Sequence, residues 1–239
     1  MADALKKVVA ELGGTYIFFL IGFGGIVAFL SYIPKAASPT LTPAALFLIA
    51  LAFGFGIFIG IMLVGHISGG HLNPAVTVSL FLAGKFEGRL VIPYIIAQLF
   101  ASVLAAATVG VFFGFGTANL THYGATVPGS MGPYVALLAE FIMTFFFLWV
   151  ILTVATRTTE VPVIAAVLGI YITAMIMLIG SISGGSVNPA RSFGPAAVSG
   201  ILLQGKFYQW IYWVGPILGG ILGSFAFKFM NGDKSKIHY

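Results

Sequence analysis

Two copies of one short motif carry the residues best suited to chemistry. Residues 67–75 read ISGGHLNPA and residues 182–190 read ISGGSVNPA, so seven of the nine positions are identical. The two asparagines, Asn73 and Asn188, lie 115 residues apart in a chain of 239 residues. This spacing is about half the chain, and it indicates an internal duplication with one motif in each half.

The local chemistry of each motif predicts an irregular loop that exposes its carbonyls and then turns into a helix. The glycine pairs Gly69–Gly70 and Gly184–Gly185 allow unusual φ angles and close backbone approach. Asn followed by Pro is a helix N-cap followed by the favoured first helical residue. The apolar runs that follow, Val76–Ala83 and Phe193–Ile201, are too short to cross a bilayer and are typical of re-entrant half-helices.

The composition places most of the chain in lipid. Hydrophobic residues make up 59% of the sequence and charged residues only 7%, more apolar surface than a soluble domain of this length can bury. The chain has no cysteine, and its four histidines lack ligand-like spacing, so thiolate chemistry, a metal site and a cofactor are not expected. No nucleophile–base pair favours an enzyme. The net charge of +5 does not favour nucleic acid, because no basic stretch is interleaved with aromatic residues.

Six segments are long enough to span a bilayer, at roughly 20 residues each. With the two half-helices they predict an all-α membrane protein, a single channel domain over residues 1–239, with an inverted repeat of about 1–116 and 130–230. Gly54 and Gly169, at matched positions in the second and fifth spans, would let those spans cross closely. The predicted spans are Val8–Ile33, Ala44–His66, Leu90–Phe115, Pro133–Thr156, Val161–Ile182 and Phe207–Met230. The first is too long for a signal peptide.

The distribution of basic residues predicts that both termini are cytoplasmic. With that orientation the inner side carries eight basic residues and the outer side two, with Arg191 reserved for a pore, which agrees with the positive-inside rule. The inner set is Lys6, Lys7, Lys85, Arg89, Arg157, Lys228, Lys234 and Lys236, and the outer set is Lys35 and Lys206.

The repeated motifs, with the Ala10-Glu11 and Ala139-Glu140 echoes and the ending NPARSFGPA, resemble the aquaporin (major intrinsic protein) family over essentially the whole chain. The resemblance implies a passive channel in which the half-helices meet at mid-membrane and Asn73 and Asn188 donate amide hydrogens to water. It also implies a homotetramer with one pore per subunit, located in the cell membrane. The implied motif residues are Asn73, Pro74, Ala75, Asn188, Pro189 and Ala190, with carbonyls of Gly69, Gly70, His71, Leu72, Gly184, Ser186 and Val187 along one wall.

The same resemblance identifies Arg191 as a selectivity-filter arginine near the outer mouth, with Phe53, Ile176 and Gly185 as the other filter positions. Strict water channels commonly have His where this chain has Ile176, so the filter is expected to be wider and less polar, similar to that of archaeal aquaporins. A second set of residues instead resembles those of the water-channel branch of the family: Ser192, Ala196 and the pair Tyr212-Trp213. Water is therefore the first expected substrate, with glycerol or another small neutral solute as the alternative.

Two acidic residues inside the spans, Glu11 and Glu140, have two interpretations. We favour buried acceptors that anchor the loops over a proton relay, because a relay needs titratable partners that the spans lack. The same carboxylates are the only coupling-ion candidates for a secondary transporter, the less favoured second function. His71 could line the inner vestibule, pack within its loop or sense pH, and the sequence does not rank these.

Overall fold

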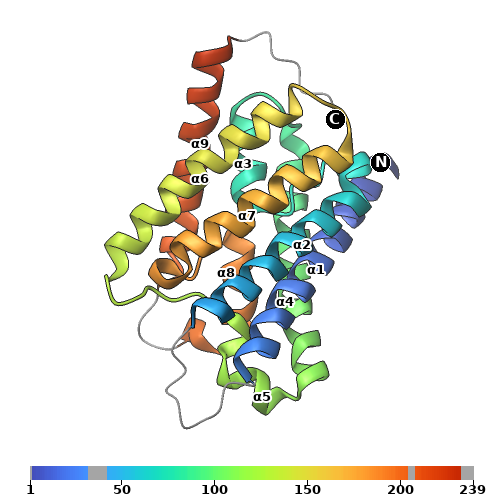
Figure 1. The fold of residues 1–239 in the computed structure, drawn as a ribbon. Helices are drawn as coiled ribbons and strands as arrows, with labels where there is room; N and C mark the ends of the chain where they lie inside the picture. The colour runs from blue at the N-terminus through green and yellow to red at the C-terminus, as the bar shows by residue number, and fades with distance from the viewer. Residues whose placement is uncertain (1, 32–41, 204–207, 233–239) are drawn as a thin grey trace.

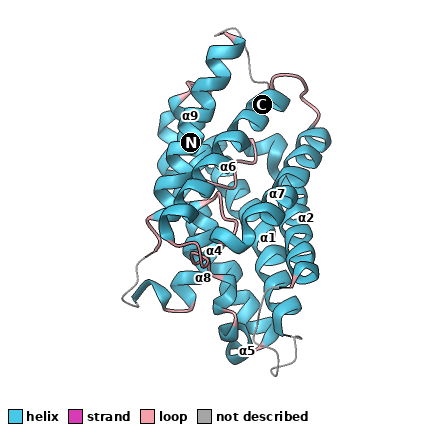
Figure 2. Cartoon of the chain, turned by 60° about the vertical axis from the view of Figure 1, so that its left-hand side comes forward, coloured by secondary structure: helices cyan, strands magenta, loops and turns pink. Residues whose placement is uncertain are grey.

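The computed structural model describes residues 2–31, 42–203 and 208–232. Within these residues every regular element is helical and there is no strand (Figure 2), which confirms the predicted all-α class. The elements in chain order are α1 (Ala2–Ser31), α2 (Pro43–Ser68), α3 (Pro74–Leu82), α4 (Gly88–Phe113), α5 (Phe115–Leu120), η1 (His122–Gly124), α6 (Pro133–Ala155), α7 (Val161–Ser183), α8 (Pro189–Val198), η2 (Ile201–Leu203) and α9 (Ile211–Asn231).

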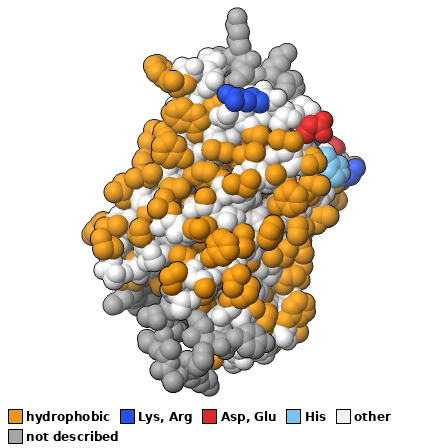
Figure 3. Space-filling model, viewed as in Figure 1, with side chains coloured by type: hydrophobic (Ala, Val, Ile, Leu, Met, Phe, Trp, Pro, Cys, Tyr) orange, Lys and Arg blue, Asp and Glu red, His pale blue; other side chains and the backbone are white. Residues whose placement is uncertain are grey.

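Six of these helices, α1, α2, α4, α6, α7 and α9, are long and apolar enough to cross a membrane. Apolar side chains cover most of the face seen in Figure 3, whereas the charged and histidine side chains visible there gather at the end where α1 begins. A surface of this kind is stable only where lipid replaces water around the helices. The protein is therefore an integral, multi-pass membrane protein.

Several helix boundaries differ from the predicted ones. Helix α1 begins at Ala2 rather than Val8, because Ala, Leu and Lys are good helix formers and Lys7 pairs with Asp3 at 3.5 Å. The half-helices α3 and α8 start at Pro74 and Pro189, as the Asn-Pro pairs predict, since proline is pre-organised for the first helical position. They end at Leu82 and Val198, before the predicted ends of the apolar runs at Ala83 and Ile201. The predicted span ends at Ile33 and Phe207 lie outside the described residues.

The connection after α4 is more ordered than the sequence suggests. Residues 117–132 are expected to be an irregular break, but α5 and η1 occupy its first part. Gly114, with φ of 81°, ends α4 and starts α5, a backbone angle that glycine adopts at little cost. Beyond η1 the chain returns to the C-terminal end of α7, where Gly129 N donates to Ile182 O at 2.8 Å.

Small residues set how closely the long helices cross. A Cβ atom on Gly54 would lie 2.7 Å from Gly169 O, and one on Gly169 would lie 2.8 Å from Gly54 O, so α2 and α7 touch backbone to backbone as predicted. Helices α6 and α9 cross in the same way, because a Cβ atom on Gly219 or Gly223 would collide with a carbonyl of α6. In lipid such close backbone packing is a main source of helix association.

The two halves of the chain interlock through their half-helices. Helix α3 of the first half packs against α9, and α8 of the second half packs against α4. Helix α1 starts at the upper end of the view in Figure 1, whereas α6 starts at the lower end, and α3 lies above α8. This inverted arrangement directs the N-termini of α3 and α8 toward each other in the interior.

Candidate functional site

The two motif loops adopt the same backbone conformation. Positive φ angles recur in register, 87°, 60° and 51° in the first loop and 85°, 60° and 47° in the second. They belong to Gly69, Gly70 and Leu72 in the first loop and to Gly184, Gly185 and Val187 in the second. Glycine accepts such angles readily, but leucine and valine do so at a cost of about 1–2 kcal/mol each, so neighbouring groups must hold Leu72 and Val187 in place.

Glu11 of α1 holds the first loop. Its Oε1 accepts hydrogen bonds from Ser68 Oγ at 2.8 Å and His71 N at 2.9 Å. Its Oε2 accepts from Leu72 N at 2.8 Å and from Gln98 Nε2 of α4 at 2.9 Å. The Glu11 side chain is fully buried, and four donors satisfy it, as a buried carboxylate requires.

Glu140 of α6 makes the equivalent contacts with the second loop. Its Oε1 accepts from Ser183 Oγ at 2.7 Å and Ser186 N at 2.8 Å, and its Oε2 accepts from Val187 N at 2.5 Å. This side chain is also fully buried. Each carboxylate thus binds the backbone N–H of the strained residue directly before an asparagine.

The two asparagines cap their own half-helices and bond across to the opposite loop. Asn73 Oδ1 accepts from Ala75 N at 2.8 Å, and Asn188 Oδ1 accepts from Ala190 N at 3.0 Å. Asn73 Nδ2 donates to Val187 O at 2.8 Å, and Asn188 Nδ2 donates to Leu72 O at 2.9 Å. Each amide nitrogen carries two hydrogens, so each keeps one hydrogen beyond this cross-loop bond.

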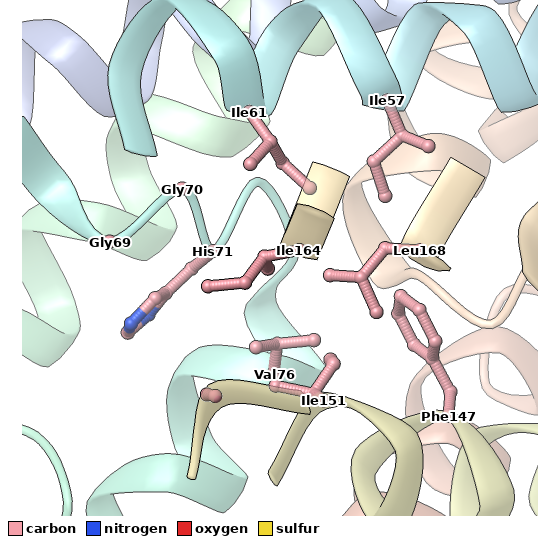
Figure 4. A pocket seen from close by; sticks show the side chains of 11 residues that line it. Ile57, Ile61, Gly69, Gly70, His71, Val76, Phe147, Ile151, Ile164 and Leu168 are labelled. Carbon is pink, nitrogen blue, oxygen red and sulfur yellow. The ribbon is translucent and has the colours of Figure 1, made fainter. Parts of the chain in front are cut away.

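Two narrow cavities meet at this junction, and both are lined by Ile57 and Phe147. Their volumes are about 10 Å³ for the first and about 20 Å³ for the second, on the order of the room that one water molecule needs. The first is lined by both asparagines and all four expected filter residues, Phe53, Ile176, Gly185 and Arg191, with Ser186 and Val187 among the others. The second is lined by Gly69, Gly70, His71 and an apolar set that includes Ile61, Val76, Ile151, Ile164 and Leu168 (Figure 4).

Arg191 lies in the first cavity, in the first turn of α8, and is 4% exposed. Its Nη1 donates to Gly124 O at 2.6 Å. Its guanidinium carbon lies 4.8 Å from the ring centroid of Phe53 and 5.8 Å from that of Phe23. Its Nε has no protein partner in the described part of the chain. Arg191 thus places a buried cation on the wall of a water-sized cavity, where its guanidinium can donate to the oxygen of a neutral solute.

The ring of His71 points away from the second cavity, as Figure 4 shows, although its backbone lines it. His71 Nδ1 lies 3.1 Å from Thr77 Oγ1. The ring centroids of Phe86 and Tyr94 lie 4.5 and 5.3 Å from that of His71. Of the three roles open from the sequence, packing within the loop is the one that this position supports.

The remaining expected residues lie close by. The prolines and alanines of the two motifs form the buried first turns of α3 and α8. Leu72 and Gly184 line neither of the two cavities. The carbonyls of Leu72 and Val187 accept the cross-loop bonds, so part of their acceptor capacity serves to join the loops.

Four residues of the site were not identified from the sequence. Phe23 contacts Arg191, Gly124 accepts its hydrogen bond, and Thr126 Oγ1 donates to Ser192 Oγ at 2.7 Å. The fourth, Gln98, joins Glu11 to the half-helix. As an isolated amide within an apolar span, Gln98 could have been suspected, whereas Phe23, Gly124 and Thr126 carry no local signal.

Comparison with known proteins agrees with this geometry. The family model for the major intrinsic protein matches residues 1–227. The chain belongs to the major intrinsic protein family. Among curated members, "Probable aquaporin TIP2-2" of Oryza sativa subsp. japonica is 36% identical over 241 residues, covering 99% of this chain and 92% of that protein. "Aquaporin AqpM" of Methanothermobacter marburgensis is 33% identical over 246 residues, covering 98% and 100%.

A solved member of the major intrinsic protein family has the same fold. The X-ray structure of the aquaglyceroporin from Plasmodium falciparum superposes with a TM-score of 0.84 at 24% identity, covering 97% of this chain and 96% of that one. At this identity the likeness establishes the aquaporin fold only. The curated relatives are aquaporins, so membership in this channel family is shown, whereas the permeant is a matter for proposal.

Proposed function

We propose that the protein is a passive channel that conducts water across a membrane and excludes protons and ions. The observation that carries the proposal is the junction of the two half-helices, where Asn73 and Asn188 face one water-wide cavity and each donates to the opposite loop. The second hydrogen of each amide is then available to the oxygen of a passing water. A water that accepts both directs its own hydrogens outward along the pore, which interrupts a chain of proton transfer.

The half-helices supply the electrostatic part of the mechanism. The N-termini of α3 and α8 each carry about half a positive charge, and both point at the junction. Two such ends raise the energy of any cation there, whereas a neutral solute meets no comparable barrier. Arg191 adds a full positive charge within the same cavity, so the barrier to cations extends from the junction to the filter.

Carbonyl oxygens on one wall replace part of the hydration that water loses on entry. The second cavity is lined by Gly69, Gly70 and His71, whose carbonyls would supply these acceptors, and by apolar residues such as Ile61 and Leu168. A wall with acceptors on one side only binds water weakly enough to let it leave, which a fast channel requires.

A second candidate, conduction of glycerol or another small neutral solute, is favoured by the filter itself. Ile176 and Gly185 line the cavity beside Arg191. An apolar side chain and a glycine leave more room, and fewer competing donors, than a filter with histidine and a larger residue. The carbon backbone of glycerol could lie against Phe53 and Ile176 while its hydroxyls accept from Arg191.

A secondary transporter is the less favoured alternative. Among the described residues, the acidic side chains at the site are Glu11 and Glu140, which accept hydrogen bonds from four and three donors respectively. Binding and release of a coupling ion there would require these bonds to break and the loops to lose their anchors. This arrangement supports the loop-anchoring role over a proton relay.

The decisive experiment measures fluxes in proteoliposomes by stopped-flow light scattering. Gradients of an impermeant osmolyte and of glycerol are applied to the same vesicles, with empty liposomes as the baseline. Fast water with baseline glycerol supports the water channel, and fast glycerol as well supports the second candidate. Baseline rates for both, or uphill uptake driven by an ion gradient, would contradict a passive channel.

We also propose a homotetramer in the cell membrane with both termini in the cytoplasm. The orientation is supported by the charged side chains at the end where α1 begins (Figure 3). Of the basic residues used to predict it, Lys35, Lys206, Lys234 and Lys236 lie outside the described residues. Native mass spectrometry of the detergent-solubilised protein tests the tetramer, and protease accessibility of terminal tags in sealed vesicles tests the orientation.

A further inference from the structure

Four phenylalanine rings of α1 and α2 form a continuous cluster that ends on the filter. The ring of Phe19 stacks on those of Phe18 and Phe23, with centroids 4.5 and 5.1 Å apart. Phe53 meets the edges of Phe18 and Phe23, each with centroids 6.1 Å apart. Phe18 and Phe53 line the first cavity, whereas Phe19 and Phe23 do not.

Arg191 rests on this cluster rather than on an acidic partner. Within the described part of the chain, no carboxylate lies within ion-pair distance of its guanidinium. Its contacts are the Gly124 carbonyl and the faces of Phe53 and Phe23. An aromatic face attracts a guanidinium within about 6 Å of its centroid, so two rings and one carbonyl fix the position of the charge.

We propose that Phe23 is a positioning residue that holds Arg191 and thereby sets the discrimination between water and larger neutral solutes. The proposal rests on the proposed channel function. Phe23 is fully buried and does not line the first cavity, so it acts through Arg191 and through Phe53. The Phe53 ring in turn lies over Gly22, where a Cβ atom would come within 2.5 Å of it.

The mechanism follows from where the guanidinium can move. Gly124 O holds Nη1 from one direction, and the Phe53 and Phe23 rings attract the same plane from another. Without the π face of Phe23, the guanidinium has one aromatic contact instead of two, so its position is less restricted. A less fixed arginine leaves a wider opening on average, which admits glycerol more than it affects water.

The chain offers a matched control in Phe19. Phe19 lies one helical turn before Phe23, is equally buried and stacks on the ring of Phe23. Within the described residues its ring makes no cation–π contact with Arg191 and no ring contact with Phe53. Phe19→Leu therefore removes similar packing from the same cluster without removing the aromatic face from the arginine. A role of Phe23 in packing alone would give both variants the same phenotype.

The test compares glycerol and water permeabilities of the wild type, Phe23→Leu and Phe19→Leu in proteoliposomes, after size-exclusion chromatography confirms folded protein. We expect the glycerol-to-water permeability ratio to rise about threefold in Phe23→Leu, because the variant loses one cation–π contact. The ratio should stay at the wild-type value in Phe19→Leu. Equal ratios in the two variants would overturn the inference. Absence of both fluxes in the wild type would instead overturn the proposed channel function.

Fluorinated phenylalanines at position 23 provide a second test that does not depend on tolerance of leucine. Ring fluorines withdraw electron density from the face while nearly preserving shape, so they weaken attraction to a cation. The glycerol-to-water ratio should rise with each added fluorine at Phe23 and remain flat for the same series at Phe19. A flat series at Phe23 would contradict the positioning role.

Discussion

Replacing Glu140 by glutamine tests whether the carboxylate anchors the second loop. Its two oxygens accept three hydrogen bonds, two at Oε1 and one at Oε2. Glutamine can keep the two bonds at Oε1 only if its amide nitrogen faces Val187 N. In that orientation the amide N–H of the glutamine faces the N–H of Val187, and both are donors. The buried N–H of Val187 therefore loses its hydrogen-bond acceptor.

The expected cost can be worked out from these contacts. Loss of a hydrogen bond to a charged acceptor costs about 1.5–3 kcal/mol, and the buried N–H without a partner keeps its desolvation penalty. The neutral amide is easier to bury than a carboxylate, which offsets part of this cost. A net destabilisation of about 2 kcal/mol follows, and it corresponds to a fall in Tm of about 4–8 °C for a chain of this length.

The loss should also reach the pore, because Val187 O is the acceptor for Asn73 Nδ2. Thermal melting followed by tryptophan fluorescence in detergent measures the stability, and stopped-flow scattering measures water flux per folded channel, which should fall severalfold. Leu138→Ala, an exposed position on the same helix, is the control and should change neither. An unchanged Tm and an unchanged flux in Glu140→Gln would refute the anchoring argument.

Four further changes have defined outcomes. Arg191→Val should raise the glycerol-to-water permeability ratio by about tenfold, since the filter loses its donor and most of its bulk; an unchanged ratio in the flux assay would remove Arg191 from the filter. Because the chain has no cysteine, mercurial salts should leave water flux unchanged, and strong reversible inhibition would contradict this expectation. Gly223→Ala should destabilise the α6–α9 crossing by about 1–3 kcal/mol in thermal melts, whereas Gly13→Ala, with open space around its Cβ position, should not. Val76→Thr adds a hydroxyl to the apolar wall of the second cavity and should change water flux by about twofold or more, with Val78→Thr on the same half-helix, outside that lining, as the control.

The architecture could be predicted because lipid imposes simple rules on sequence. Each span must be apolar for its whole length, so hydropathy alone locates six helices. The glycine at position 54 and its counterpart at 169 could be matched by spacing from the two asparagines, and the helices do cross there. The short half-helices were predictable because Asn-Pro both caps and starts a helix.

The partners of Arg191 could not be predicted, because they come from segments distant in sequence. Gly124 reaches Arg191 because α5 and η1 reverse the chain, and Tyr123, at φ of 56°, turns the backbone there. Nothing in the sequence around Phe23 distinguishes it from the other phenylalanines of α1. The position of His71 was undecided for the same reason, since Phe86 and Tyr94 turn its ring away from the cavity.

The two cavities are counterparts of each other, and the difference between them explains how a duplicated fold gains selectivity. Positions at equal spacing from the two asparagines form four matched pairs. Phe53 and Leu168 lie 20 residues before their asparagines, and Ile61 and Ile176 lie 12 residues before. Gly70 and Gly185 lie three residues before, and Val76 and Arg191 lie three residues after. The members Phe53, Ile176, Gly185 and Arg191 line the first cavity, and Ile61, Gly70, Val76 and Leu168 line the second. Two of the pairs have the same residue type in both cavities. In the other two, the aromatic ring and the cation of the first cavity correspond to aliphatic side chains in the second. On the proposed function, the shared positions give both halves of the pore an isoleucine and a glycine on the wall, while the cation and the ring that holds it confine solute recognition to one end.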